Sequence, residues 1–231
     1  MAETDNKTRY LELAHFSLFA PCPGVENRNS RLAWCMSYNP TTEIIYPRVT
    51  VFLNNPSVTG AAGILYAPFD SATLLIVLKE LEKVVLGPAG GKCKISNYTQ
   101  LRENGVIVPN AEKVLQSELW FGKDTDGICW ISVVMPDRPK IKFEFLLSAY
   151  HKITKSDGTE ANKAEGSVLQ ALAVIEAVSE AYKRFTTAVK KPAVGGAAGG
   201  SRSTYTPKTA GASKEAKVPA DDMFEEADIG F

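Results

Sequence analysis

Alternation of apolar and polar residues predicts strands in the first part of the chain. Apolar, β-branched and aromatic residues gather in three runs separated by turn residues, at 10–19, 31–38 and 44–53. Two sets of side chains alternate along the third run and are expected on opposite faces: Val49, Val51, Leu53 and Arg48, Thr50, Phe52. Pro47 lacks an N–H donor, so this strand is expected to begin at a sheet edge or a bulge.

Apolar spacings of three and four predict two helices. The first begins at Asp70 or Ser71, either of which can cap it, and stops at Gly87 and Pro88. The second is a long amphipathic helix over 166–191, with basic residues in its last turns. Further strands are predicted at 92–98, 127–135 and 140–150, where the turn residues at 137–139 make the last two a hairpin. The segment 101–125 reads as a long irregular insertion.

The order of these elements points to a mainly β fold with helices. Three strands, a helix, then further strands ending in a hairpin are compatible with several folds. The fold they favour is the OB-fold, a five-stranded Greek-key barrel with a helix between strands 3 and 4, here followed by a long C-terminal helix.

Charge divides the 231 residues into three segments, although the net charge is zero. Residues 1–189 are neutral as a group and are expected to form the core domain. Residues 190–218 carry six bases against one acid and are rich in Gly, Ala and Ser, so a flexible basic linker is expected. Residues 219–231 hold five acids and no base, which predicts an acidic tail.

The residues needed for catalysis or metal binding are sparse. The four cysteines lie far apart, so no metal is expected, and no motif calls for a cofactor. His15 and His151 read as surface or satisfied core histidines rather than general bases. GPAGGKC at 87–93 resembles a phosphate loop, but its spacing is one residue short and Cys93 replaces the Ser or Thr, so it reads as a helix stop and turn. We therefore predict a protein that is not an enzyme.

The location expected for the chain is the cytoplasm. Its N-terminus, MAETDNKTRY, is polar, and its apolar runs are too short to span a bilayer, so no membrane contact is expected. Reduced thiols are the default in that compartment.

Rings and cations recur together on alternating strand positions. The residues concerned are Tyr46, Arg48, Phe52, Lys92, Lys94, Tyr98, Trp130, Lys140 and Lys142. A sheet face of this kind suits single-stranded nucleic acid, because unpaired bases stack on rings at about 1–3 kcal/mol each while cations neutralise phosphates. Neither helix presents the basic surface that reads a duplex. The competing interpretation is that the cations only solvate an outer face and that rings such as Trp34 and Trp120 are core.

The acidic tail ends in an aromatic residue, Phe231. A terminal Phe can enter an apolar pocket rimmed by bases while the neighbouring acids steer the encounter. This plan of a core, a low-complexity linker and an acidic tip resembles the single-stranded DNA-binding proteins of bacteria and tailed phages. In that family the tip recruits replication, recombination and repair proteins, and in phage members it also competes with DNA for the groove. The resemblance implies partner-binding roles for Asp221, Asp222, Glu225, Glu226, Asp228, Ile229 and Phe231.

The ending ADIGF departs from the bacterial D-[IL]-P-F pattern, because Gly230 stands where proline is usual. The insertion at 101–125 and the helix at 166–191 are also foreign to the compact bacterial core. These departures favour a phage-encoded member of the family, which would work in the cytoplasm of a bacterial host. Two alternatives stay open: a protein-interaction or virion-associated adaptor with a docking tail, and a single-stranded RNA binder.

Overall fold

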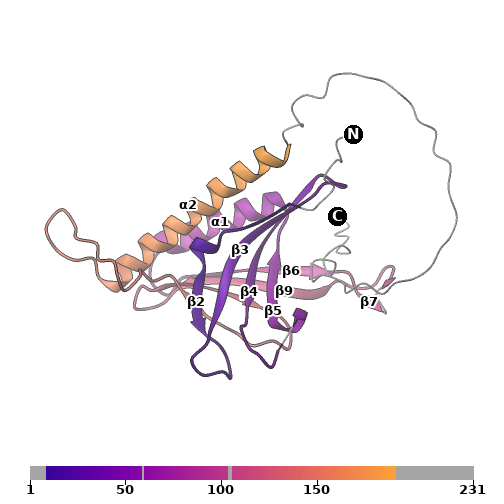
Figure 1. The fold of residues 1–231 in the computed structure, drawn as a ribbon, viewed down its shortest axis with the longest axis horizontal. Helices are drawn as coiled ribbons and strands as arrows, with labels where there is room; N and C mark the ends of the chain where they lie inside the picture. Colours follow the sequence, from indigo (N-terminus) through magenta and orange to yellow (C-terminus); the bar gives the residue numbers. More distant parts are fainter. Residues whose placement is uncertain (1–8, 59, 104–105, 191–231) are drawn as a thin grey trace, which may run out of the picture. The chain divides into compact units, whose positions relative to one another are not determined.

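The computed structural model describes residues 9–58, 60–103 and 106–190, which form two antiparallel sheets and two helices (Figure 1). The predicted linker and tail lie outside these residues, apart from the end of the second helix. The predicted mixture of strands and helices, with a long helix last, is confirmed.

Sheet A is built from the first five strands. They are β1 (Arg9–Glu12), β2 (Leu18–Pro21), β3 (Asn29–Asn39), β4 (Ile44–Phe52) and β5 (Ile64–Pro68). β1 and β2 pair with opposite ends of β3, so together they form one interrupted edge. The prediction of a single strand over 10–19 is therefore wrong: a 3-10 turn, η1 (Ala14–Phe16), closes through backbone bonds from Phe16 to Leu13 and from Ser17 to Ala14, in place of ladder bonds.

β5 was not predicted, and it explains how Pro47 fits inside β4. The short 3-10 turn η2 (Gly60–Gly63) precedes β5, which pairs with β4 only as far as Pro68 opposite Arg48. Pro47 follows directly outside that ladder while still pairing with Met36 of β3. The carbonyl of Pro47 accepts from the N–H of Phe69 at 2.8 Å, so the missing donor of Pro47 falls where the β5 ladder ends, as expected for a proline at the margin of a ladder.

Helix α1 (Ser71–Leu86) follows sheet A and has the predicted bounds. Its N-cap is Asp70, whose side chain accepts a bond of 2.7 Å from the backbone N–H of Thr73. The chain leaves the helix at Gly87, so the stretch 87–93 is a helix stop and turn, as predicted. Lys123 stabilises this end, because its Nζ donates to the carbonyls of Val85 and Gly87 at 3.0 Å each.

Sheet B contains the later strands in the order β11-β10-β9-β6. Their bounds are β6 (Lys92–Thr99), β9 (Val114–Lys123), β10 (Cys129–Val134) and β11 (Phe143–Glu144), and β7 (Arg102–Glu103) with β8 (Val106–Ile107) forms a separate small hairpin. The expectation of an irregular insertion over 101–125 is wrong, because β9 lies between β6 and β10. Leu119 and Phe121 of β9 are fully buried.

The predicted hairpin at 137–139 exists, but its second arm is short. β10 and β11 pair antiparallel around Asp137, whose φ of 57° fits a turn. Ladder pairing resumes only at Phe143, so most of the run 140–150 is not strand. Ile141, Phe143 and Phe145 are nevertheless buried, so the predicted alternation is confirmed.

The two halves of the described chain have the same order of secondary-structure elements, although the sequence contains no repeat. Sheet A is a meander of four strand positions followed by α1, and sheet B is a meander of four strands followed by α2 (Lys163–Lys190). In Figure 1 the strands β2 to β5 run across the direction of β6 and β9. One core contains residues from the inner faces of both sheets and from both helices. The described ladders thus form two open sheets, not the closed five-stranded barrel that was expected.

Candidate functional site

Face A is the side of sheet A that points away from the core. Cross-strand partners in an antiparallel sheet share a face, so the register Arg31–Phe52, Cys35–Arg48 and Ser37–Tyr46 fixes its middle rows. We define face A as Tyr10, Phe19, Arg31, Tyr46, Arg48, Phe52 and Tyr66. Phe19, at the β2 edge, is 60% exposed. Rings and guanidinium groups therefore stand together on this face.

The cations of face A lie on its rings. The guanidinium of Arg31 is 4.5 Å from the centroid of Phe52, and that of Arg48 is 5.7 Å from the centroid of Tyr10. Arg31 also forms an ion pair with Glu12 of β1. The hydroxyl of Tyr10 donates to Cys35 Sγ at 3.0 Å, and burial together with this contact raises the pKa of Tyr10 above its usual range. Tyr10 is thus a neutral ring at physiological pH.

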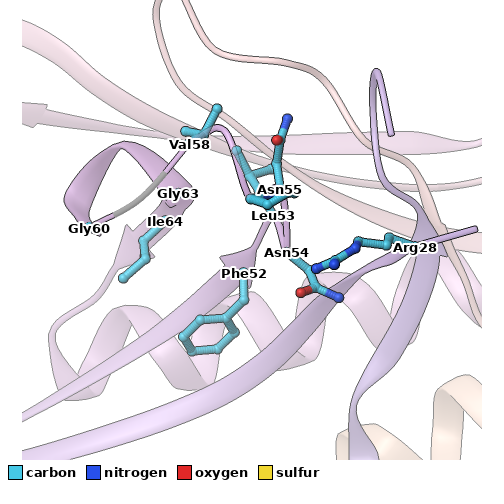
Figure 2. A pocket seen from close by; sticks show the side chains of 10 residues that line it. Arg28, Phe52, Leu53, Asn54, Asn55, Val58, Gly60, Gly63 and Ile64 are labelled. Carbon is cyan, nitrogen blue, oxygen red and sulfur yellow. The ribbon is translucent and has the colours of Figure 1, made fainter. Parts of the chain in front are cut away.

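A hollow of about 260 Å³ opens beside Phe52 (Figure 2). Its lining includes Arg28, Asn54, Asn55 and Ile64. In Figure 2 the guanidinium of Arg28 extends toward the side chain of Asn54. The hollow therefore adds a third arginine and amide groups to the end of face A.

Face B is the corresponding side of sheet B. The register sets Lys92, Gly122, Trp130 and Glu144 in one row across the sheet, and sets Lys94, Trp120 and Ser132 in the next. We define face B as Lys92, Lys94, Glu118, Trp120, Trp130, Lys142 and Glu144. Both indoles are half-buried, and the three lysines are exposed. Face B therefore presents two tryptophans in adjacent rows.

Each tryptophan of face B carries a lysine. Lys94 Nζ is 5.1 Å from the Trp120 ring centroid, and Lys142 Nζ is 5.9 Å from that of Trp130. Carboxylates hold these lysines: Glu118 accepts from Lys94 at 2.8 Å, and Lys142 pairs with Asp124 and, at 3.3 Å, with Glu144. The lysines are thus positioned over the rings before any ligand arrives.

Glu118 also fixes the orientation of an indole. Its second oxygen accepts from Trp120 Nε1 at 2.8 Å, and Ser96 Oγ is 3.3 Å from the first. The bond from Lys94, then that from Trp120, keeps the pKa of the Glu118 carboxyl below its ordinary value, although partial burial opposes the shift. Glu118 is therefore ionised at neutral pH and joins the lysine and the ring into one unit.

A second hollow, of about 510 Å³, lies beside Trp130. Its lining includes Lys92, Lys123, Asp124, Asp126 and the turn at Gly90 and Gly91. Within the described part of the chain, Lys92 forms no ion pair. Lysines and aspartates are equal in number in this lining, so the hollow beside Trp130 is polar and not net cationic.

The structure divides the predicted nucleic-acid residues between the two faces. Tyr46, Arg48 and Phe52 lie together on face A, and Lys92, Lys94, Trp130 and Lys142 lie together on face B. The expected single face is therefore wrong, because the strands belong to two sheets. Two further predicted residues are peripheral: Tyr98 is 59% exposed beyond a bulge that follows Asn97, and Lys140 is exposed in the loop before β11.

Sequence reasoning missed other members of these faces. Arg31 and Tyr10 were within predicted strands, and pairing with Phe52 and Arg48 could not be deduced without the register. Trp120 was hidden in the supposed insertion, although Leu119 and Phe121 flank it with the alternation of a strand. Trp34 is core, with 1% exposure, but Trp120 is not.

His15 and His151 are exposed. The four cysteines, all within the described ranges, are free thiols. Across residues 9–58, 60–103 and 106–190, no three His, Cys, Asp or Glu side chains gather where they could hold a metal ion. Neither helix of that part is long and apolar enough to cross a bilayer.

Comparison of the chain with protein-family models, with curated proteins and with solved structures yields no match. The resemblance to single-stranded DNA-binding proteins therefore stays a prediction from the sequence.

Proposed function

We propose that the chain is a non-enzymatic protein that binds single-stranded DNA without sequence preference. The observation that carries the proposal is face B, where Trp120 and Trp130 stand in adjacent rows, each with a lysine within 6 Å of its ring centroid. Every base has a π-face, so stacking on such rings tolerates any sequence, while the lysines meet the phosphates.

The carboxylates of face B do not prevent this binding. The pair of Lys94 and Glu118 is partly exposed, with 49% of the lysine side chain and 16% of the glutamate side chain accessible, and ion pairs at the surface contribute only about 0–1 kcal/mol. A phosphate can replace the carboxylate as the partner of the lysine at small cost. Lys92 and Lys140, which make no ion pair with other described residues, supply further charge without any exchange.

The shape of the site favours single strands over duplexes. The rings lie on an open sheet face, where unpaired bases can stack on them. In a duplex the bases stack on one another, so their π-faces are not accessible to the indoles. On the helices, the exposed lysines of α1 alternate with glutamates, as in the pairs Lys79–Glu82 and Lys83–Glu80. Such a surface does not complement the backbone of a duplex.

The proposal includes the biological role that the resemblance implies. The protein would act in replication, recombination and repair, encoded by a phage and working in the cytoplasm of its host. The basic linker would add weak phosphate contacts. The acidic segment 219–231 would compete with DNA for the cationic faces and recruit partner proteins.

The test is a titration of fluorescent oligothymidine followed by anisotropy. The full-length chain and a version ending at Pro219 are compared at two salt concentrations. We expect binding that weakens with salt and strengthens on truncation, because counterion release drives it and the acidic segment opposes it. A matched RNA oligonucleotide separates DNA from RNA binding. Absence of binding by both versions at low salt would remove the proposal and favour a protein-interaction adaptor.

A further inference from the structure

We propose that face A is a second, separate binding site for single-stranded nucleic acid, so that each chain binds two short strands at once. This inference rests on the proposed function and adds to it a site on the other sheet. The inference starts from the order of elements that the two halves share, in which a meander of four strand positions is followed by a helix.

The same unit of three groups recurs on the two sheets. On face A, Arg31 lies 4.5 Å from the Phe52 centroid and pairs with Glu12. On face B, Lys94 lies 5.1 Å from the Trp120 centroid and pairs with Glu118. In both units the ring and the cation stand directly opposite each other on neighbouring strands. A second ring and cation accompany each unit: Tyr10 with Arg48, and Trp130 with Lys142.

Each face also ends at a hollow with at least one cation in its lining, although two aspartates, Asp124 and Asp126, accompany the lysines beside Trp130. The hollow beside Phe52 includes Arg28, and the hollow beside Trp130 includes Lys92 and Lys123. A base stacked on the outermost ring of either face would thus have space and a cation next to it. Face A matches face B in rings, cations and adjoining space, and it differs by carrying arginine in place of lysine.

The two faces are separate surfaces because both sheets turn their inner sides to one core. Trp34 and Val51 of sheet A share that core with Phe121 and Ile131 of sheet B. Alternation along each strand therefore directs the residues of faces A and B away from it, on different sheets. The borders of the two faces are joined at Tyr66, whose hydroxyl accepts from Gln116 Nε2 at 3.2 Å. Gln116 is four residues from Trp120, about 13 Å along an extended strand.

The location of the tryptophans allows the two sites to be observed separately. Trp120 and Trp130 are on face B, while Trp34, the third tryptophan of the chain, is buried in the core. Quenching of tryptophan fluorescence by unlabelled oligonucleotide therefore reports on face B. Anisotropy of a labelled oligonucleotide reports on both faces together.

The experiment uses the full-length chain and hexathymidine, a length of about the smallest sites on such surfaces. We expect two hexamers per chain. Phe52→Leu, which keeps an apolar side chain but removes the ring, should reduce the ratio to one and leave the quenching unchanged. Trp120→Leu should also reduce the ratio to one, with loss of quenching. Phe19→Ala should also weaken binding at face A, and because Phe19 is 60% exposed this substitution should leave the core intact. Tyr150→Leu, at a residue 93% exposed and outside both sheets, is the control and should keep both sites.

A ratio of one hexamer per chain that Phe52→Leu does not alter would overturn the second site and leave the proposed function standing. Absence of any hexamer binding, together with absence of binding to longer oligothymidine, would instead remove the proposed function and the second site with it.

Discussion

The indole of Trp130 lies directly against Gly122, its partner on the neighbouring strand. A Cβ atom added to Gly122 would stand 2.6 Å from Cζ2 of Trp130, closer than any real contact. The backbone of Gly122 is not in the left-handed region, so the glycine is needed for space alone. The Trp130 ring can lie this close to face B because its partner has no side chain.

The substitution Gly122→Ala should move the Trp130 ring off the sheet. We expect the intrinsic fluorescence to shift toward that of exposed tryptophan. The free energy of binding to oligothymidine should weaken by about 1–3 kcal/mol, the contribution of one stacked base. Fluorescence spectra and anisotropy titrations measure the two effects.

Trp130→Leu provides the control for this prediction. If Gly122 acts only through the ring, Gly122→Ala should weaken binding no further in a chain that already carries Trp130→Leu, as a double-mutant cycle would show. If Gly122→Ala weakens oligothymidine binding equally in the wild type and in the Trp130→Leu chain, the added methyl group disturbs the sheet itself.

The cap of α1 gives a prediction about stability. Asp70→Ala should lower the free energy of unfolding by about 1 kcal/mol, because the N–H groups at the helix start lose their acceptor. Burial of the Asp70 side chain raises its pKa, but the bonds from Thr73 outweigh this effect, so the pKa lies below the ordinary value. The stabilisation from ionised Asp70 is thus complete above the ordinary pKa of about 3.8 and is lost as the pH falls through the folded value.

Asp70→Asn separates the cap from its charge. Asparagine is as good an N-cap as aspartate and does not titrate in this range. In urea unfolding at neutral pH it should match the wild type, and below pH 4 the difference between wild type and Asp70→Ala should shrink. A difference that persists unchanged into that acid range would show that Asp70 does not stabilise α1 through its carboxylate.

Sequence patterns correctly predicted those elements whose capping residues and apolar spacing lie within a single segment of the chain. The spacing of Leu74, Leu78 and Leu81, with Asp70 before and Gly87 after, predicted α1 with its bounds. Alternation likewise placed Arg48 and Phe52 on the side opposite Val49 and Val51, which are buried. These assignments depend on the chemistry of neighbouring residues and on the two backbone periodicities.

Pairing between segments could not be predicted in the same way. β9 was missed because Gly and charged residues surround its alternating run, and it becomes a strand by pairing on both sides, with β6 and β10. With β5 also unrecognised, the strands were assigned to a single barrel, and one face was expected where there are two. The contact of Arg31 with Phe52 depends on cross-strand register, which single-segment patterns do not determine.

The central position of β9 can be tested by a core substitution. Phe121→Ala should lower the free energy of unfolding by about 3–5 kcal/mol, since it empties a fully buried position between two strands. Tyr150→Ala, at an exposed ring, should change it by less than about 0.5 kcal/mol. Denaturant unfolding of both variants makes the comparison. Similar small effects would fit a surface insertion and would contradict the pairing of β9 with β6 and β10.

Glu118 provides a test of how the ion pairs of face B affect binding. Glu118→Gln keeps an oxygen that can accept from Trp120 Nε1 but removes the negative charge beside Lys94. Because the carboxylate repels phosphates, we expect oligothymidine to bind about two- to fivefold more tightly at low salt, as befits an exposed pair worth less than 1 kcal/mol, with the gain shrinking as salt rises. Glu82→Gln removes a matched charge that pairs with Lys79 on α1 and should leave the affinity unchanged. Weaker binding by Glu118→Gln would mean that holding Lys94 over the ring matters more than the repulsion.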